Sequence, residues 1–127
     1  MSTTKIGRDS RVLLVDDSMF VRMLLGGIVA RDGYDVIGDA CTGDEAVTSF
    51  DRLRPDIVIM DLVMPGLNGI EATRRIRELD PDAHIIICSA VNQRPIVEEA
   101  LAAGACAYLE KPPPRSLLLE TLAAVGA

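Results

Sequence analysis

Short runs of consecutive apolar residues recur along the chain, and the strongest of them end abruptly on polar side chains. Three such runs cover residues 12–15, 57–60 and 85–88, and they stop at Asp16, Asp61 and Ser89. The residues in each run do not alternate between apolar and polar, so each run predicts a strand buried on both faces, as in a parallel sheet. Two milder runs, which predict strands at the edges of that sheet, lie at residues 36–40 and 105–109.

Helical patterns fill the segments between the predicted strands. They extend over about residues 19–31, 43–52, 69–79, 95–103 and 115–125. Four apolar residues of the first helix recur at helical spacing and are expected to share one face, namely Phe20, Met23, Leu24 and Ile28. The glycine pair at 26–27 weakens that helix by roughly 1 kcal/mol per glycine, and its pattern suggests no function.

Two of the helix starts carry capping signals. Thr42 followed by Glu45 fits a capping box, in which the threonine hydroxyl accepts from one backbone N–H and the glutamate carboxylate accepts from another. Asn68 with Glu71 three residues later predicts an N-cap for the third helix.

The ends of the predicted strands fall near residues 16, 40, 61, 89 and 111, so one strand and one helix fit each interval. Such strict alternation predicts five β/α units with right-handed crossovers and a parallel sheet. The first, third and fourth strands are the most apolar, which suits the centre of the sheet. The predicted fold class is therefore α/β, a doubly wound (βα)5 flavodoxin-like fold with a five-stranded parallel sheet of order 2-1-3-4-5 and helices on both faces.

Composition narrows the class of protein. The 127 residues suffice for one domain, which we place at residues 11–125, after a disordered leader at 1–10 and without an output domain. No apolar run approaches the ~20 residues of a membrane span, and the polar start has no signal-peptide core. A net charge of −6 argues against direct binding of nucleic acid. The three cysteines lack metal-like spacing, so we interpret them as reduced thiols of a cytoplasmic protein rather than a redox centre.

The polar residues at the strand ends form one predicted site. Adjacent first and third strands bring together Asp16, Asp17 and Asp61, while Ser89 and Lys111 end the fourth and fifth strands. Three clustered carboxylates raise one another's pKa values, and a divalent cation relieves that conflict. Mg²⁺ prefers oxygen ligands and phosphate. A cation, an ammonium and a hydroxyl suit phosphoryl transfer, and a carboxylate can serve as the nucleophile. The sequence thus predicts Mg²⁺-dependent phosphorylation of an aspartate.

The same residues carry a family resemblance. The motifs that carry it are Asp16-Asp17, Asp61 with Met64-Pro65, Ser89-Ala90 and Lys111-Pro112. Residues 11–125 resemble the receiver domain of bacterial two-component response regulators. Residues 14–24 and 85–111 are most similar to chemotaxis regulators that consist of a receiver alone.

The resemblance implies roles for individual residues. Asp61 would be the phosphoacceptor, Asp17 a direct Mg²⁺ ligand and Asp16 a ligand through water, with the backbone carbonyl of Val63 as a further ligand. Ser89 would turn its hydroxyl to the phosphoryl group, and Lys111 would pair with that phosphate on a loop shaped by a cis peptide before Pro112. Tyr108 matches the aromatic switch position that moves inward when Ser89 is engaged, and Ala90 leaves space for the approaching phosphodonor.

The resemblance also implies partners. A histidine kinase or a small phosphodonor would phosphorylate Asp61, and a downstream protein would bind the face of the fourth helix, fifth strand and fifth helix. The chain is then a phosphoacceptor with intrinsic autophosphorylation and autodephosphorylation chemistry rather than an enzyme. It would be a stand-alone regulator or, alternatively, a receiver taken from a longer regulator with an output domain.

Two departures from the family pattern affect these expectations. Pro113 stands where an aromatic residue usually follows Lys111-Pro112, which changes the packing of the final loop. Val63 and Val91 are apolar at positions that flank the path of the hydrolytic water and often carry polar groups. We therefore expect autodephosphorylation not to be among the fastest in the family.

Other interpretations remain open for the same residues. Asp16-Asp17 and Ser89 could be helix caps, Lys111 a solvated lysine, and Tyr108 a half-buried edge tyrosine without a function. His84, just before a strand, is expected to be a surface residue.

A small aspartyl-phosphate phosphatase is a competing function, but those enzymes carry a second acid two residues after a nucleophile at the first strand, where this chain has Ser18. A nucleotide or flavin binder would need a glycine-rich phosphate loop, which the chain lacks.

Overall fold

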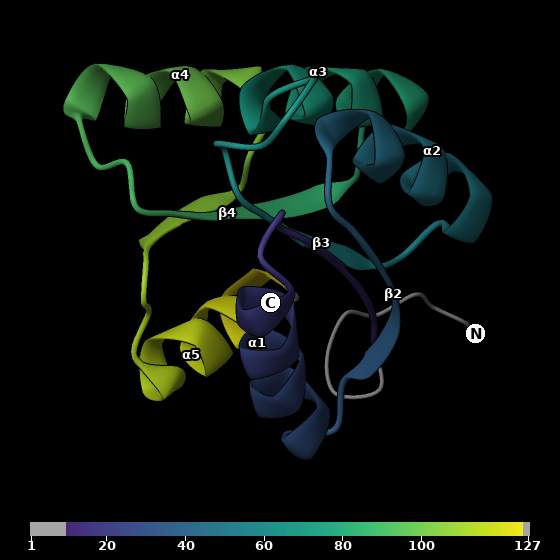
Figure 1. Ribbon diagram of the computed structural model, residues 1–127, viewed down its shortest axis with the longest axis vertical. Helices are drawn as coiled ribbons and strands as arrows, with labels where there is room; N and C mark the ends of the chain where they lie inside the picture. Colours follow the sequence, from purple (N-terminus) through teal and green to yellow (C-terminus); the bar gives the residue numbers. More distant parts are fainter. Residues whose placement is uncertain (1–9, 126–127) are drawn as a thin grey trace.

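The computed structural model describes residues 10–125, in which strands and helices alternate (Figure 1). The strands are β1 (Arg11–Val15), β2 (Asp35–Ala40), β3 (Ile57–Met60), β4 (His84–Ser89) and β5 (Ala107–Glu110). The helices are α1 (Met19–Arg31), α2 (Gly43–Leu53), α3 (Gly69–Leu79), α4 (Arg94–Ala103) and α5 (Arg115–Val125). None of these helices is long and apolar enough to cross a membrane.

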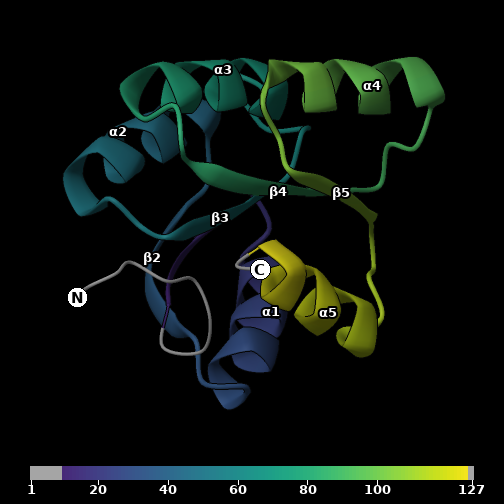
Figure 2. The ribbon, with the colours of Figure 1, turned by 180° about the vertical axis from the view of Figure 1, so that it is seen from behind.

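The strands form a single parallel sheet of order β2-β1-β3-β4-β5, as the sequence predicts. Figures 1 and 2 show α2, α3 and α4 on one face of the sheet and α1 and α5 on the other. Side chains of β1, β3 and β4 are buried on both faces, because helices cover both faces. All five strands point the same way, so the residues that follow them gather at one edge of the sheet.

Most element boundaries agree with the sequence pattern, and the differences are small. β5 begins at Ala107 rather than 105, and the predicted surface residue His84 is the half-buried first residue of β4. Ser10 is buried, and its carbonyl accepts a hydrogen bond from the backbone N–H of Asp35 at 2.9 Å. Ser10 therefore joins the folded domain, while the rest of the expected leader, residues 1–9, lies outside the described residues.

The predicted apolar face of α1 is mostly exposed, and of its four residues only Ile28 is half-buried and packs against the core. Phe20 and Met23 are 73% and 69% exposed, and the residues that α1 buries are Leu25 and Val29. The first half of α1 is apolar nearly all round, so periodicity alone does not select the face that meets the sheet. Gly26 decides part of the packing, because a Cβ there would lie 3.1 Å from the Leu14 side chain.

Both predicted helix caps are present. The backbone N–H of Glu45 donates to the Thr42 hydroxyl at 3.0 Å, and that of Glu71 donates to the Asn68 side chain at 2.9 Å. The Glu45 carboxylate returns to the backbone N–H of Cys41 at 2.9 Å, one residue before the cap. Each cap satisfies a backbone N–H that the helix itself leaves unpaired.

Candidate functional site

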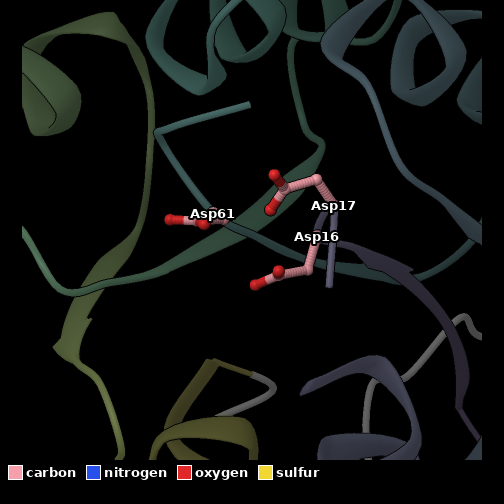
Figure 3. A group of neighbouring side chains, drawn as sticks. All are labelled: Asp16, Asp17 and Asp61. Atoms are coloured by element: carbon pink, nitrogen blue, oxygen red, sulfur yellow. The ribbon is translucent and has the colours of Figure 1, made fainter. Parts of the chain in front are cut away.

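The pairing of β1 with β3 brings the three predicted carboxylates together. Val15 and Met60 are register partners at the ends of these strands, so the residues that follow them lie side by side. The backbone N–H of Asp61 donates to the Val15 carbonyl at 2.9 Å, which extends the ladder to the site. One carboxylate oxygen from each of Asp16, Asp17 and Asp61 lies within 4.8 Å of the others. Figure 3 shows the three side chains gathered at one place.

Backbone N–H groups orient the two buried carboxylates. The Oδ1 atom of Asp16 accepts from the N–H of Ser18 at 2.9 Å, and Oδ1 of Asp61 accepts from the N–H of Leu62 at 2.7 Å. Asp16 and Asp61 are 4% and 6% exposed, whereas Asp17 is exposed to solvent. The cluster therefore combines two fixed carboxylates with one that solvent reaches.

Lys111 joins the two buried carboxylates from the end of β5. Its Nζ lies 2.6 Å from Oδ2 of Asp16 and 3.0 Å from Oδ2 of Asp61. Burial acts to lower the pKa of Lys111, but the hydrogen bonds that its ammonium donates to Asp16 and Asp61 outweigh this effect and raise the pKa above its ordinary value. The backbone N–H of Lys111 donates to the Ser89 carbonyl at 2.9 Å, and the Lys111–Pro112 peptide is cis.

Ser89 and Tyr108 both bond to the same loop residue, Val91. The Ser89 hydroxyl, which is fully buried, accepts from the backbone N–H of Val91 at 3.2 Å. The Tyr108 hydroxyl donates to the carbonyl of Val91 at 2.5 Å. Burial raises the pKa of Tyr108 above its ordinary value. The loop after β4 is thus held by two hydroxyls, that of Ser89 at the end of β4 and that of Tyr108 on β5.

Gly69 supports the site, and the sequence interpretation did not identify it. A Cβ at Gly69 would collide with the carbonyl oxygen of Asp61 and lie 2.8 Å from the Cα of Leu62. The N–H of Gly69 donates to the Leu62 carbonyl at 2.9 Å. The start of α3 therefore packs directly against the backbone of Asp61. The only sequence signal for this contact is a glycine directly after the Asn68 cap.

The donor set fits a hard divalent cation. Three carboxylates face one ammonium, so the cluster keeps an excess of negative charge, and all its free donor atoms are oxygens, which Mg²⁺ prefers. The hydrogen bonds that orient Oδ1 of Asp16 and Asp61 reduce the cost of holding these atoms close together. With a divalent cation bound beside Lys111, the arrangement would suit a reaction in which negative charge develops beside a carboxylate nucleophile.

Comparisons with known proteins agree with this geometry. The family model for the response regulator receiver domain matches residues 12–123. The chemotaxis protein CheY of Thermotoga maritima is 48% identical over 112 residues, which are 88% of this chain and 93% of that protein. CheY of Bacillus subtilis is 38% identical over 112 residues, with the same coverage of both chains.

A solved structure shows the same fold. A chain in the crystal structure of the CheX-CheY-BeF3-Mg complex from Borrelia burgdorferi superposes with a TM-score of 0.91 and 33% identity. The match covers 95% of this chain and 92% of that chain. The strand order, the acidic cluster and the sequence match all support one conclusion: this chain belongs to the response regulator receiver domain family.

Proposed function

We propose that this receiver domain is a signalling switch in which Asp61 accepts a phosphoryl group. The observation that carries the proposal is the position of the Asp61 carboxylate, which lies beside Asp16 and Asp17 and pairs with Lys111 at 3.0 Å. The backbone N–H of Leu62 orients Oδ1 of Asp61 at 2.7 Å, and Oδ2 of the same carboxylate contacts Lys111.

In the proposed reaction, a carboxylate oxygen of Asp61 attacks the phosphorus atom of a phosphodonor. The new P–O bond makes an acyl phosphate, and the bond to the leaving group breaks, with the electron pair going to the imidazole nitrogen of a phosphohistidine or to the acetate oxygen of acetyl phosphate. Asp16 and Asp17, with the Val63 carbonyl, would hold Mg²⁺, which supplies positive charge to the phosphoryl oxygens when bound. Lys111 would then exchange its contact with Asp61 for one with the phosphate.

The switch would use the loop after β4. Val91 is bonded to the Ser89 hydroxyl through its N–H and to the Tyr108 hydroxyl through its carbonyl. When Ser89 turns to the phosphoryl group, it releases the N–H of Val91, and the bond to Tyr108 is disturbed through the same residue. Phosphorylation would thus bias a two-state equilibrium of the α4, β5 and α5 face.

The proposed partners follow from the relatives. A histidine kinase would supply the phosphoryl group, and a downstream protein would bind the α4, β5 and α5 face. Because CheY of Thermotoga maritima and of Bacillus subtilis are chemotaxis proteins, we propose a chemotaxis output. The domain would act as a phosphoacceptor with its own slow hydrolysis, and a phosphoryl lifetime of only seconds without a phosphatase would contradict the effect expected of Val63 and Val91.

Acetyl phosphate with Mg²⁺ provides the test. Intact mass should rise by the mass of one phosphoryl group in the parent protein, and chelation of Mg²⁺ should abolish the gain. Asp61→Asn should show no gain, whereas the matched control Asp82→Asn, which replaces an exposed acid in the turn before β4, should behave like the parent. An equal gain in intact mass in Asp61→Asn and in the parent would contradict the proposal.

A further inference from the structure

Arg22 reaches from the start of α1 to the backbone that joins two of the clustered carboxylates. Its Nη1 donates to the backbone carbonyl of Asp16 at 2.6 Å, and its Nε donates to Oδ2 of Asp39 at 3.0 Å. The Arg22 side chain is only 16% exposed, although its partner Asp39, on the edge strand β2, is 61% exposed. One guanidinium thus ties α1 to the end of β1 and to β2.

The acidic cluster, which consists of Asp16, Asp17 and Asp61, needs a backbone that departs from strand geometry after β1. Successive side chains of a strand point to opposite faces of the sheet, but Asp16 and Asp17 both direct a carboxylate to the same place as Asp61 (Figure 3). The N–H of Asp16 still donates to the Ala40 carbonyl at 3.0 Å, so the chain leaves the ladder at the next peptide. The carbonyl of Asp16 lies in that peptide, and Arg22 supplies its hydrogen bond.

The orientation of this peptide matters most for Asp17. The Oδ1 atom of Asp16 is held by the N–H of Ser18 at 2.9 Å, whereas no hydrogen bond or ion pair within residues 10–125 holds the Asp17 carboxylate. The position of Asp17 therefore depends on its backbone, and rotation of the peptide between residues 16 and 17 would carry its carboxylate away from the cluster. Arg22 resists that rotation, because a carbonyl shielded from water loses free energy when it loses its partner.

We propose that Arg22 is a positioning residue for Mg²⁺, which it favours by fixing the peptide between Asp16 and Asp17. The inference rests on the proposed function, in which these two residues hold the cation. Mg²⁺ demands near-ideal octahedral geometry, whereas Ca²⁺ accepts a flexible set of oxygen ligands. Loss of the fixed peptide therefore weakens the binding of Mg²⁺ more than the binding of Ca²⁺.

A role through charge alone predicts the opposite sign. Removal of a cation near three carboxylates makes the site more negative and strengthens its attraction for any divalent cation. Arg22→Met removes both the charge and the bond to Asp16, so the two explanations predict opposite changes in the Kd for Mg²⁺. Arg22→Lys keeps the charge but replaces a planar fork that reaches two acceptors by a single ammonium.

Titrations of the full chain with MgCl2 and with CaCl2, without a phosphodonor, measure the two affinities through the amide NMR signals of residues 16–18 and 61–63. Arg22→Met should raise the Kd for Mg²⁺ about tenfold, as the loss of a contact that orients metal ligands commonly does. It should raise the Kd for Ca²⁺ less than about threefold. Arg22→Lys should raise the Kd for Mg²⁺ at least roughly threefold. The carbonyl carbon signal of Asp16 should shift in Arg22→Met before any metal is added, because its hydrogen bond is lost.

Two control variants separate orientation from charge. Arg74→Met makes the same change in net charge, but the partners of Arg74 are Glu71 at 3.1 Å and Glu99 at 3.4 Å, which lie outside the acidic cluster. Its Kd for Mg²⁺ should match that of the parent. Asp39→Asn removes a charge but keeps an oxygen acceptor for Nε of Arg22, so the Kd for Mg²⁺ should change less than about twofold.

The outcomes distinguish this inference from the proposed function. Weaker Mg²⁺ binding in both Arg22 variants, with a smaller change for Ca²⁺ and none in Arg74→Met, supports it. The inference is overturned if folded Arg22→Met binds Mg²⁺ at least as tightly as the parent, or if the affinities for both ions fall by the same factor. If Arg22→Met does not fold, Arg22→Lys decides by the same criteria. If Mg²⁺ shifts no signal of residues 16–18 and 61–63 in the parent, the proposed metal site itself fails, and this inference fails with it.

Discussion

Replacement of Lys111 by methionine should destabilise the fold, because the carboxylates of Asp16 and Asp61 then repel each other without a neutralising cation. The Nζ atom of Lys111 is the cation that contacts both buried carboxylates, at 2.6 Å from Asp16 and 3.0 Å from Asp61. Methionine keeps most of the length of the side chain and removes the charge. The variant therefore leaves two carboxylates, 4% and 6% exposed, close together without a neutralising partner.

The expected magnitude follows from these distances. At an effective dielectric constant of about 20, the two contacts with Lys111 are worth about 6 and 5.5 kcal/mol, and carboxylate oxygens 4.8 Å apart repel by about 3.5 kcal/mol. Desolvation of three charged groups offsets much of the attraction, and the Lys111 side chain remains 19% exposed. We expect Lys111→Met to lower the free energy of unfolding by about 2–4 kcal/mol without metal.

Urea unfolding with and without Mg²⁺ measures this effect. Roughly 10 mM Mg²⁺ should stabilise Lys111→Met at least ~1 kcal/mol more than the parent, because the cation then replaces the missing ammonium. Arg94→Met is the matched control, since Arg94 forms an exposed ion pair with Glu98 at 3.8 Å and its loss should cost less than about 0.5 kcal/mol. If Lys111→Met loses as little free energy of unfolding as the control, or if Mg²⁺ leaves its loss unchanged, Lys111 does not neutralise Asp16 and Asp61 as argued.

Four further substitutions have definite expected results. Gly27 has open space where a Cβ would lie, so Gly27→Ala should stabilise α1 by about 0.5–1 kcal/mol in urea unfolding. Gly69→Ala should instead destabilise the domain by more than about 2 kcal/mol, because its Cβ meets the β3–α3 backbone. Similar effects of both changes would contradict this packing. Burial raises the pKa of Cys88 from 9.0 to about 11, so the folded state keeps a proton that the unfolded chain releases. Stability should therefore fall as pH rises from 9 to 11, and Cys88→Ala should reduce that fall by about 2 kcal/mol; an unchanged pH profile of Tm would argue against it. Tyr108→Phe removes the 2.5 Å bond to the Val91 carbonyl and should cost about 1 kcal/mol, and no loss in urea unfolding would show that the bond is not formed in solution.

The sheet topology and the acidic cluster follow from the sequence because both depend on strong local signals. The unbroken apolar runs that end at Asp16 and Asp61 define two central strands, and the strand order makes them neighbours. The carboxyl ends of parallel strands then meet at one edge. Lys111 follows in the same way from its place after the fifth strand.

The packing of α1 does not follow from periodicity. Phe20 and Met23 have helical spacing, but the buried residues are Leu25 and Val29. Gly26 packs closely against Leu14, since a Cβ there would lie 3.1 Å from its side chain, and such a tertiary contact is not visible in the periodicity. The result leaves an apolar surface at the start of α1, where Phe20 and Met23 are exposed.

The hydrogen bonds that link Ser89, Val91 and Tyr108 could not be predicted from the pattern of apolar and polar residues either. A serine at a strand end and a tyrosine in an edge strand are compatible with many partners. Their common contact with the backbone of Val91 arises because β4 and β5 are paired, with Ile87 opposite Tyr108. The sequence alone gives the residue types but not the loop that connects them.

Direct identification of the phosphorylated side chain tests whether Asp61 is the phosphoacceptor. After reaction with acetyl phosphate and Mg²⁺, borohydride reduces an acyl phosphate of aspartate to homoserine, and peptide mass spectrometry locates the converted residue. We expect homoserine at position 61 alone and none in the sample from which Mg²⁺ was chelated. Conversion at Asp16, Asp17 or another acid, with Asp61 intact, would contradict it.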